Sequence, residues 1–318
     1  MVVQQLLDQT RLNPSGHAFT AVPLPIAGAY IATDLEGRPV LFVEANGALG
    51  IASMRTRCLE LLITRPFTLS PGTSPALFHA LRCDASDPSE IAAFVSLLEA
   101  FVAVPRVNIS GDELVAFFRA MGRLFATVPS RDVKSAREGL WGELFLMRQT
   151  RGYVWWLPYW HTEPNRPFDF TAGEKRVEVK TALGSDRIHH FAHRQIFAAS
   201  SESILIASLL VREDDNGLSL KTLISECRGA TPRLDDIIKL EKALRQCDML
   251  LGAEEGPSYN EAAANQSIGW YWASQAPHFE SPEPAGVSDT RYRVDLSTAP
   301  NVDSGILGQW LSTWSVSR

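Results

Sequence analysis

The sequence predicts an α/β fold, in which a mixed sheet core is flanked by helices, with a β-rich N-terminal domain before it and a C-terminal extension after it. Three observations support this prediction. Apolar and β-branched runs, broken by Gly, Pro and Asp, fill residues 1–85. Helices with clear start signals follow these runs. Further along, the short apolar segment SILIASLLV is typical of a strand that is buried on both faces.

The N-terminal strands are expected in the runs VPLPIAGAYIATD, RPVLFVEA and LELLITRPFTL. Asp87-Pro88-Ser89-Glu90 then combines a cap, a proline in the first turn and an acid, which predicts a helix over 88–102. Pro105 is expected to end this unit. We therefore place the β-rich domain at residues 1–107.

Two further helices are expected before the central strands. Ser110-Gly111-Asp112-Glu113 is a capping box, and apolar residues recur after it at spacings of three, four and seven. The next helix is expected over 132–150, because Arg148 lies in its last turn and Gly152 comes just after its end.

The segments that follow predict strands in YVWWL, RPFDFTA and KRVEVKTA, a short helix over 191–199, and the buried strand SILIASLLV. Helices are expected near 218–227 and 232–251, and the chain ends with a strand in RYRVDL and a helix over 307–314. These elements predict a core at residues 108–252 and an extension at 253–318 that packs on it.

Composition excludes several classes of protein. The net charge of −6 argues against a protein that coats DNA through a broad positive surface. No uncharged apolar run is long enough for a membrane span, and the N-terminus is a poor secretory signal. The four cysteines form neither CxxC nor a zinc-finger spacing, which favours reduced thiols in a cytoplasmic protein.

The most informative pattern is the hairpin expected in RPFDFTAGEKRVEVKT. A two-residue type II′ turn at Gly173-Glu174 would place Asp169 directly opposite Glu178. Since side chains alternate along a strand, Lys180 would share the face of Glu178. Two adjacent carboxylates need a cation between them, or one of them must keep its proton. Carboxylate oxygens, waters and a substrate phosphate together suit Mg²⁺ or Mn²⁺.

Glu143 adds a third acid. Its neighbours at three and four residues along the expected helix are Gly139, Leu140, Leu146 and Met147. An unpaired carboxylate is costly on such an apolar face. Gly139 and Gly142 would let this helix approach a sheet closely and bring Glu143 towards the metal.

The order GLWGELFLM, FDF, VEVKT and RIHHFAHRQ resembles the PD-(D/E)XK nuclease superfamily, and more closely a bacterial branch of it that is associated with restriction and phage-defence gene clusters. The resemblance covers most of the chain and is sharpest over 139–195. It implies a restriction-endonuclease-like fold for the core at 108–252. One departure is that Pro167 and Asp169 are separated by Phe168. Another is that Gln195 lacks the tyrosine of the exonuclease-like QxxxY motif.

The resemblance also implies a role for each site residue. Asp169 and Glu178 would bind the divalent metal with help from the Val179 carbonyl, and Glu143 matches the acid on the first core helix of the superfamily. Lys180 would orient or deprotonate the attacking water. Gln195 would position water on the metal, or a phosphate.

The function expected from this site is Mg²⁺- or Mn²⁺-dependent endonucleolytic cleavage of DNA, within a restriction or phage-defence system. Partners such as a methyltransferase or a helicase-like ATPase are implied by the resemblance. The alternative is a non-catalytic nucleic-acid-binding or assembly subunit with a nuclease-like fold. Residues 131–195 contain eleven Lys or Arg and eight Asp or Glu, a local excess of positive charge. Seven cations there could contact phosphates or could be ordinary solvated side chains: Arg131, Lys134, Arg137, Arg148, Arg151, Arg187 and Arg194.

Three histidines form a separate pattern, His189-His190-x-x-His193. His189 and His193 are four residues apart, as a metal-binding pair on a helix would be. Phosphate contact or a surface position is the more common explanation. A metal hydrolase based on these histidines stays the weakest of the three functional hypotheses.

Overall fold

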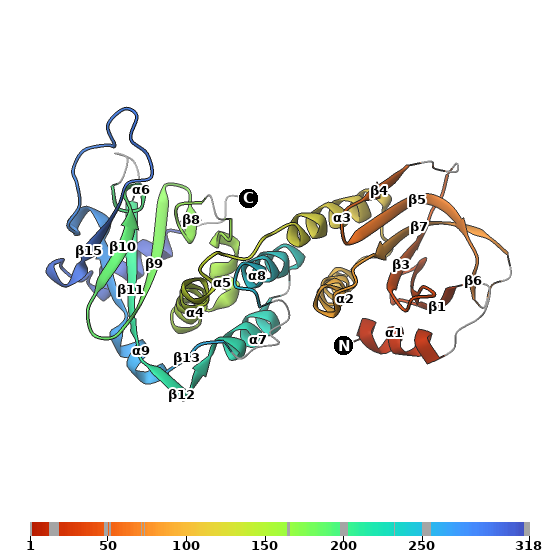
Figure 1. Ribbon diagram of the computed structural model, residues 1–318, viewed down its shortest axis with the longest axis horizontal. Helices are drawn as coiled ribbons and strands as arrows, with labels where there is room; N and C mark the ends of the chain where they lie inside the picture. The colour runs from red at the N-terminus through yellow and green to blue at the C-terminus, as the bar shows by residue number, and fades with distance from the viewer. Residues whose placement is uncertain are drawn as a thin grey trace. The chain divides into compact units, whose positions relative to one another are not determined.

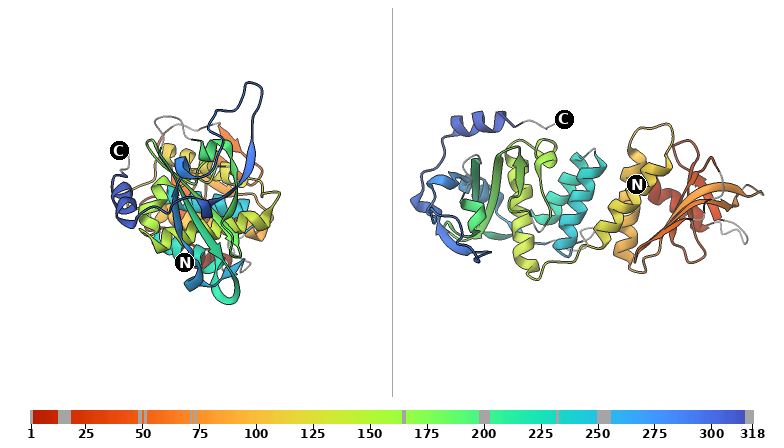
Figure 2. Two further views of the ribbon diagram at one scale, coloured as in Figure 1. Left: turned by 90° about the vertical axis from the view of Figure 1, so that its left-hand side faces the viewer. Right: turned by 90° about the horizontal axis from the view of Figure 1, so that it is seen from above.

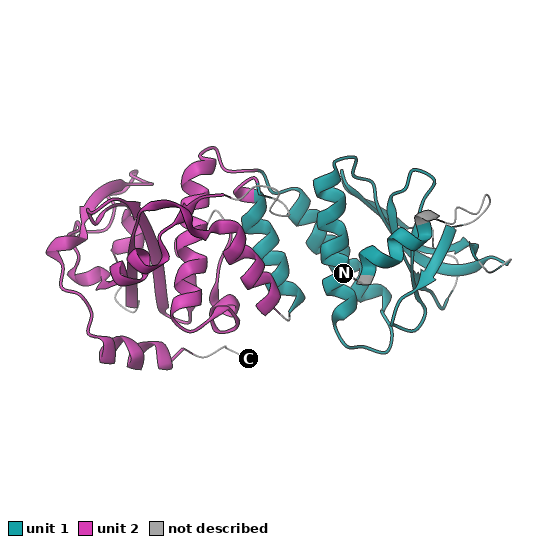
Figure 3. Ribbon diagram, turned by 90° about the horizontal axis from the view of Figure 1, so that it is seen from below, with its two compact units in different colours: residues 1–128, 233–245, 249–251 teal, residues 129–232, 246–248, 252–318 magenta. Residues whose placement is uncertain are grey.

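The computed structural model describes residues 2–12, 19–47, 50, 52–70, 72, 74–163, 166–197, 203–231, 233–249 and 256–314. The chain divides into two compact units (Figure 3). Unit 1 comprises residues 1–128, 233–245 and 249–251, and unit 2 comprises residues 129–232, 246–248 and 252–318. These compact units are divided at positions other than 107 and 252, where we placed the domain boundaries. The predicted boundaries themselves stay predictions.

Unit 1 is built on a seven-stranded sheet with the order β4-β5-β7-β3-β2-β1-β6. Its strands are β1 (Phe19–Pro23), β2 (Ala29–Thr33), β3 (Pro39–Glu44), β4 (Ser53–Arg55), β5 (Leu59–Phe67), β6 (Leu69–Ser70) and β7 (Ala76–Cys83). Every pairing is antiparallel except that of β1 with β6. The expected β-rich N-terminal region is therefore confirmed.

The helices of unit 1 are α1 (Val2–Leu12), α2 (Pro88–Ala103), α3 (Gly111–Phe125) and nearly all of α8 (Leu234–Gln246). The two predicted start signals are present: the Asp87 side chain accepts from Ser89 N, and Ser110 and Glu113 form a capping box. We did not predict α1, although Val3 and Leu7, four residues apart, are its buried anchors.

Unit 2 contains a four-stranded sheet with the order β14-β11-β9-β8. Its strands are β8 (Phe170–Ala172), β9 (Lys175–Leu183), β11 (Ser203–Val211) and β14 (Gly269–Trp272). β9 and β11 are parallel, and the other two pairings are antiparallel, so the predicted mixed sheet is confirmed. β14 comes from the region that we expected only to pack on the core. β11 is the predicted SILIASLLV strand, and nearly all of its residues are buried.

Helix α4 (Val133–Gln149) packs on one face of this sheet, and a two-stranded ribbon of β10 (Ile188–Ala192) and β15 (Arg291–Asp295) lies on the other (Figures 1 and 2). The remaining helical elements of unit 2 are α5 (Tyr153–Trp156), η1 (Leu157–Tyr159), α6 (His193–Ile196), α7 (Leu220–Ala230), α9 (Glu261–Ser267), η3 (Ala273–Gln275), η4 (Leu296–Thr298) and α10 (Ser304–Ser312). A second small ribbon pairs β12 (Glu213–Ser219) with β13 (Ser258–Tyr259).

Two local predictions were wrong. YVWWL is not a strand but α5 followed by a 3₁₀ turn, because Gly152 reverses the chain at φ +83° and the Trp156 indole donates back to Thr150. The helix expected over 191–199 is shorter, because Phe191 belongs to β10 and pairs with Tyr292, about a hundred residues away. Its expected end, at 198 and 199, lies outside the described residues, as do 232, 250 and 251 of the helix expected over 232–251.

In the described part of the chain, no helix is both long enough and apolar enough to cross a membrane.

Candidate active site

The β8–β9 hairpin has the predicted register. Phe170 pairs with Val177, and Ala172 pairs with Lys175 around the turn. Gly173 has φ +58°, which a type II′ turn requires at its first central position. Continuing this register by one residue brings Asp169 opposite Glu178, at the point where the regular pairing ends.

Asp169 is held at that position through the backbone. Val179 N–H donates to Asp169 Oδ2 over 2.7 Å. The N–H and C=O of one strand residue point to the same side, so the Val179 carbonyl also faces the side of Asp169. The two carboxylates and this carbonyl are thus brought to one edge of the sheet.

Glu178, Lys180 and Gln195 meet on the face that is covered by the β10–β15 ribbon. Lys180 Nζ lies 2.7 Å from Glu178 Oε1, and Gln195 Nε2 donates to the same oxygen over 2.6 Å. Gln195 Oε1 accepts from Ala192 N–H and lies 3.4 Å from Lys180 Nζ. The lysine ammonium also lies 4.9 Å from the centre of the Phe191 ring. Gln195 from α6 is therefore joined in one network with Glu178 and Lys180, which lie two residues apart on β9.

Burial changes the protonation of the acids. It is the main cause that raises the pKa of Glu178 to about 8, with the nearby Asp169 carboxylate as the second cause. Burial likewise raises the pKa of Asp169 to about 6, although the bond from Val179 opposes the rise. The pKa of Glu143 is raised well above its ordinary value by burial and then by Asp169. Near neutral pH the cluster thus favours keeping a proton, as expected for adjacent carboxylates without a second cation.

Glu143 reaches the cluster from α4, on the other face of the sheet. A Cβ on Gly142 would overlap the hydroxyl oxygen of Thr181 on β9, so only glycine allows this close approach. Trp160 Nε1 donates to Glu143 Oε2 over 2.6 Å and orients the carboxylate. Our expectation that Gly139 also allows this approach was wrong, because a Cβ there would meet nothing within 4 Å.

The donor set fits a divalent cation. Glu178 is only 3% exposed, and its Oε2 is buried with no hydrogen-bond partner in the structure, while Oε1 is occupied by Lys180 and Gln195. Two carboxylates and a backbone carbonyl are oxygen ligands of the kind that Mg²⁺ and Mn²⁺ prefer, with water filling the remaining positions. Among the described residues, no group of three or more His, Cys, Asp or Glu side chains is arranged to hold a metal ion, so the proposed site needs the Val179 carbonyl and water beside Asp169 and Glu178.

Most of the cations that we named as phosphate contacts have partners inside the protein. Arg137 donates to the carbonyls of Cys247 and Asp248, and Arg148 pairs with Glu226 and Glu261. Arg187 donates to Ser208 and Ser267. Arg194 is exposed on α6 directly beside Gln195, and the Glu283 carboxylate interacts with it electrostatically.

The histidines do not form the helical pair that their spacing suggested. His189 is buried on β10, where its Nε2 is 2.8 Å from the Ser208 hydroxyl. His193 is buried at the start of α6 and contacts the Tyr292 hydroxyl through Nδ1. His190 points outwards and is exposed. The change from strand to helix at Ala192 breaks the i, i+4 geometry.

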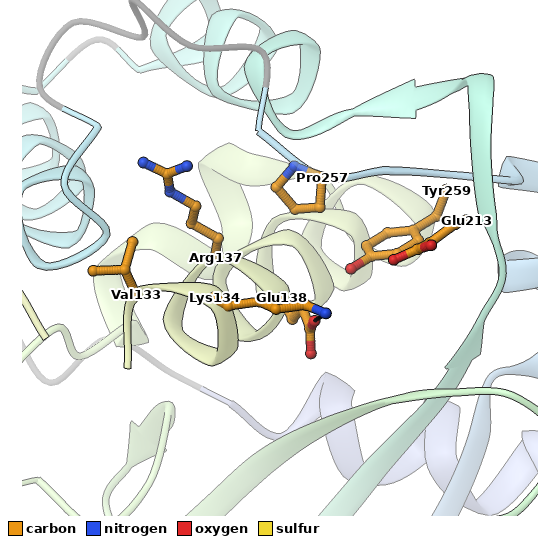
Figure 4. Close-up of a pocket in the computed structure, with 7 residues that line it drawn as sticks. All are labelled: Val133, Lys134, Arg137, Glu138, Glu213, Pro257 and Tyr259. Carbon is orange, nitrogen blue, oxygen red and sulfur yellow. Dashed lines mark ion pairs between the residues drawn. The ribbon is translucent and has the colours of Figure 1, made fainter. Parts of the chain in front are cut away.

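The sequence analysis missed Trp160 and Phe191 as parts of the site. Trp160 comes just before the hairpin and forms an isolated bridge with Phe170. Phe191 is two residues from His189 on the same face of β10, and period-two alternation could have placed it there. A separate pocket of about 420 Å³ next to α4 contains none of the predicted site residues (Figure 4). It is lined by Val133, Lys134, Arg137, Glu138, Glu213, Pro257 and Tyr259.

Comparison with known families agrees with this architecture. A family model described as "Putative PD-(D/E)XK family member, (DUF4420)" matches residues 86–297, which include the hairpin, α4, α6 and the β10–β15 ribbon. No curated protein and no solved structure gives a significant match. Because the family model spans about two thirds of the sequence, the chain belongs to this PD-(D/E)XK family.

Proposed function

We propose that this protein is a metal-dependent DNA endonuclease that hydrolyses phosphodiester bonds. The observation that carries the proposal is the meeting of Asp169, Glu178 and Lys180 at one edge of the sheet, with Glu178 Oε2 buried and unpartnered. This arrangement provides oxygen ligands for a cation and a positive charge within reach of the same point. It is the combination that phosphodiester hydrolysis needs.

Each side chain of the site has a separate role in this proposal. Asp169, Glu178 and the Val179 carbonyl would hold Mg²⁺ or Mn²⁺, with Glu143 as a further acid behind Asp169. The bound cation supplies charge neutralisation at the phosphate and lowers the pKa of water. Lys180 orients the attacking water and stabilises negative charge that develops on the phosphate. Gln195 fixes Glu178 and Lys180 relative to each other through its two amide atoms.

We further propose that the protein acts in a restriction or phage-defence system. The resemblance to a branch with that association supports this part of the proposal. The net charge of −6 is consistent with a subunit that gains part of its DNA affinity from partners, such as a methyltransferase or a helicase-like ATPase.

The test is a cleavage assay on modified and unmodified duplex DNA with Mg²⁺ or Mn²⁺. Asp169→Asn and Lys180→Ala should each lower the cleavage rate by about 100- to 1000-fold, as the loss of essential charge stabilisation does elsewhere. Circular dichroism and thermal unfolding should show that both variants remain folded. A matched control is Asp186→Asn, because Asp186 is an exposed acid between β9 and β10.

Undiminished cleavage by purified Asp169→Asn would contradict the proposal. A wild-type protein that neither binds Mn²⁺ at this site nor cuts any DNA would instead favour the non-catalytic binding or assembly subunit.

A further inference from the structure

The outer face of the β10–β15 ribbon has an excess of positive charge. His190 pairs directly with Arg293, and Ala192 pairs with Arg291. His190, Arg291 and Arg293 are all exposed, whereas the alternate residues Phe191 and Val294 are buried against the sheet. The ribbon therefore has an apolar inner face and a basic outer face.

The two arginines are available to a partner. Neither Arg291 nor Arg293 forms an ion pair or a side-chain hydrogen bond with any described residue, in contrast to Arg137, Arg148 and Arg187. The acid on the same face, Asp295, already accepts from Ser297 N–H and Oγ as a helix cap. In a chain of net charge −6, this unpaired basic face has no obvious structural purpose.

The ribbon is physically connected to the candidate active site. The Phe191 ring contacts the Lys180 ammonium from the inner face. Ala192, the partner of Arg291, donates its N–H to Gln195 Oε1. Arg194 is exposed one residue before Gln195, with the Glu283 carboxylate within electrostatic reach. A polyanion bound along Arg293, Arg291 and Arg194 would thus lie on the outer side of the ribbon whose inner side contacts Lys180, and it would reach the position next to Gln195.

We propose that this ribbon is the surface that docks double-stranded DNA, with Arg291 and Arg293 contacting phosphates and Arg194 continuing the contact towards the active site. The inference rests on the proposed nuclease function. A two-stranded antiparallel ribbon fits the major groove of B-DNA, which is about 12 Å wide. Charge complementarity supplies the attraction, because phosphate contacts by Arg and Lys dominate DNA affinity.

The experiment measures binding of a labelled 30-base-pair duplex by fluorescence anisotropy in EDTA, so that no cleavage occurs. Arg291→Ala/Arg293→Ala is compared with wild type and with Arg212→Ala/Lys221→Ala, which removes two exposed cations elsewhere in unit 2. The ribbon variant should bind roughly tenfold or more weakly at about 0.1 M salt, and its salt dependence should fall by about 1.8 in slope, since two phosphate contacts are lost. The control should match wild type.

Equal affinity of the ribbon variant and wild type, or an equal loss in the control, would overturn the inference. It would also be overturned if wild type bound single-stranded DNA or RNA of the same length more tightly than the duplex. A different result would count against the nuclease proposal alone. In that case duplex binding would depend on Arg291 and Arg293, but wild type would not cut DNA with Mg²⁺ or Mn²⁺. Cleavage by wild type without any ribbon-dependent binding would refute the docking surface alone.

Discussion

Gln195 Nε2 donates to Glu178 Oε1 over 2.6 Å, and the same amide group accepts from the Ala192 backbone through its oxygen. The amide is therefore fixed at both ends. It holds one oxygen of Glu178 on the side of Lys180 and leaves the other, Oε2, without a partner. The orientation of the proposed metal ligand thus depends on a residue that touches no metal itself.

Gln195→Ala should weaken Mn²⁺ binding and slow DNA cleavage by about 10- to 100-fold each, as loss of an orienting partner does at other metal sites. Calorimetric Mn²⁺ titration and single-turnover cleavage measure the two effects. Gln149→Ala is the matched control, because its amide donates to Glu261 in a solvent-exposed pair away from Glu178. If Gln195→Ala and Gln149→Ala gave the same Mn²⁺ affinity, the orienting role would be refuted.

The raised pKa of Glu178 predicts a stability change with pH in the absence of metal. Its carboxyl titrates near 4.5 in an unfolded chain and at about 8 in the folded protein, so the folded state binds the extra proton between these values. The free energy of unfolding should therefore fall as pH rises from 6.5 to 8.5. Thermal unfolding in EDTA should show this slope in wild type and a flatter one in Glu178→Gln. Parallel pH dependences in the two proteins would contradict the assigned protonation.

The affinity for Mn²⁺ should change with pH in the opposite direction to the free energy of unfolding. Because the bound form needs ionised carboxylates, Mn²⁺ affinity should rise with pH between about 6 and 8, and binding should release protons. Calorimetry in two buffers of different ionisation enthalpy measures the proton release. An Mn²⁺ affinity that stayed constant over this range would argue against binding by Asp169 and Glu178.

His189 offers an independent pH test. Burial, followed by the charges of Lys180 and Arg187, lowers its pKa from 6.5 to about 4. The unfolded state thus binds the proton first as pH falls, and stability should decrease from pH 6.5 towards pH 4. Relative to His189→Gln, wild type should lose roughly 2–3 kcal/mol of unfolding free energy over that range. An NMR titration that placed the His189 pKa near 6.5 would refute the prediction.

The sequence predicted the parts of this molecule that local signals determine. The caps at Asp87 and Ser110 and the turn at Gly173 each depend on residues within a few positions, and all three are present as expected. Because the turn sets the register, the approach of Asp169 to Glu178 could also be predicted.

Long-range pairings were beyond local reasoning. Phe191 became part of a strand because Tyr292 pairs with it, and β14 joined the sheet through β11. The basic face of the ribbon forms because β15, near the end of the chain, brings Arg291 and Arg293 beside His190 on β10. No periodicity within a short window indicates such a combination, because each strand alone carries only part of the charge.

Helix α4 and strand β9 approach each other closely at Gly142. A Cβ on Gly142 would overlap Thr181 Oγ1 and lie 3.2 Å from Thr181 Cβ, so Gly142→Ala must turn the Thr181 side chain or move the helix away from the strand. The expected cost is about 1–3 kcal/mol of unfolding free energy, despite the higher helix propensity of alanine. Since Glu143 is the next residue, DNA cleavage should fall as well.

Gly139 provides the control on the same helix. A Cβ there meets nothing within 4 Å, so Gly139→Ala should be neutral or stabilise the protein by up to about 1 kcal/mol. Adding Thr181→Ala to Gly142→Ala removes the overlapping hydroxyl and should restore part of both stability and cleavage. Urea unfolding of wild type, Gly142→Ala, Thr181→Ala and the double variant gives the interaction free energy. If Gly142→Ala were as stable as Gly139→Ala, this would contradict the inference that a close contact at Gly142 holds α4 against β9 and so positions Glu143.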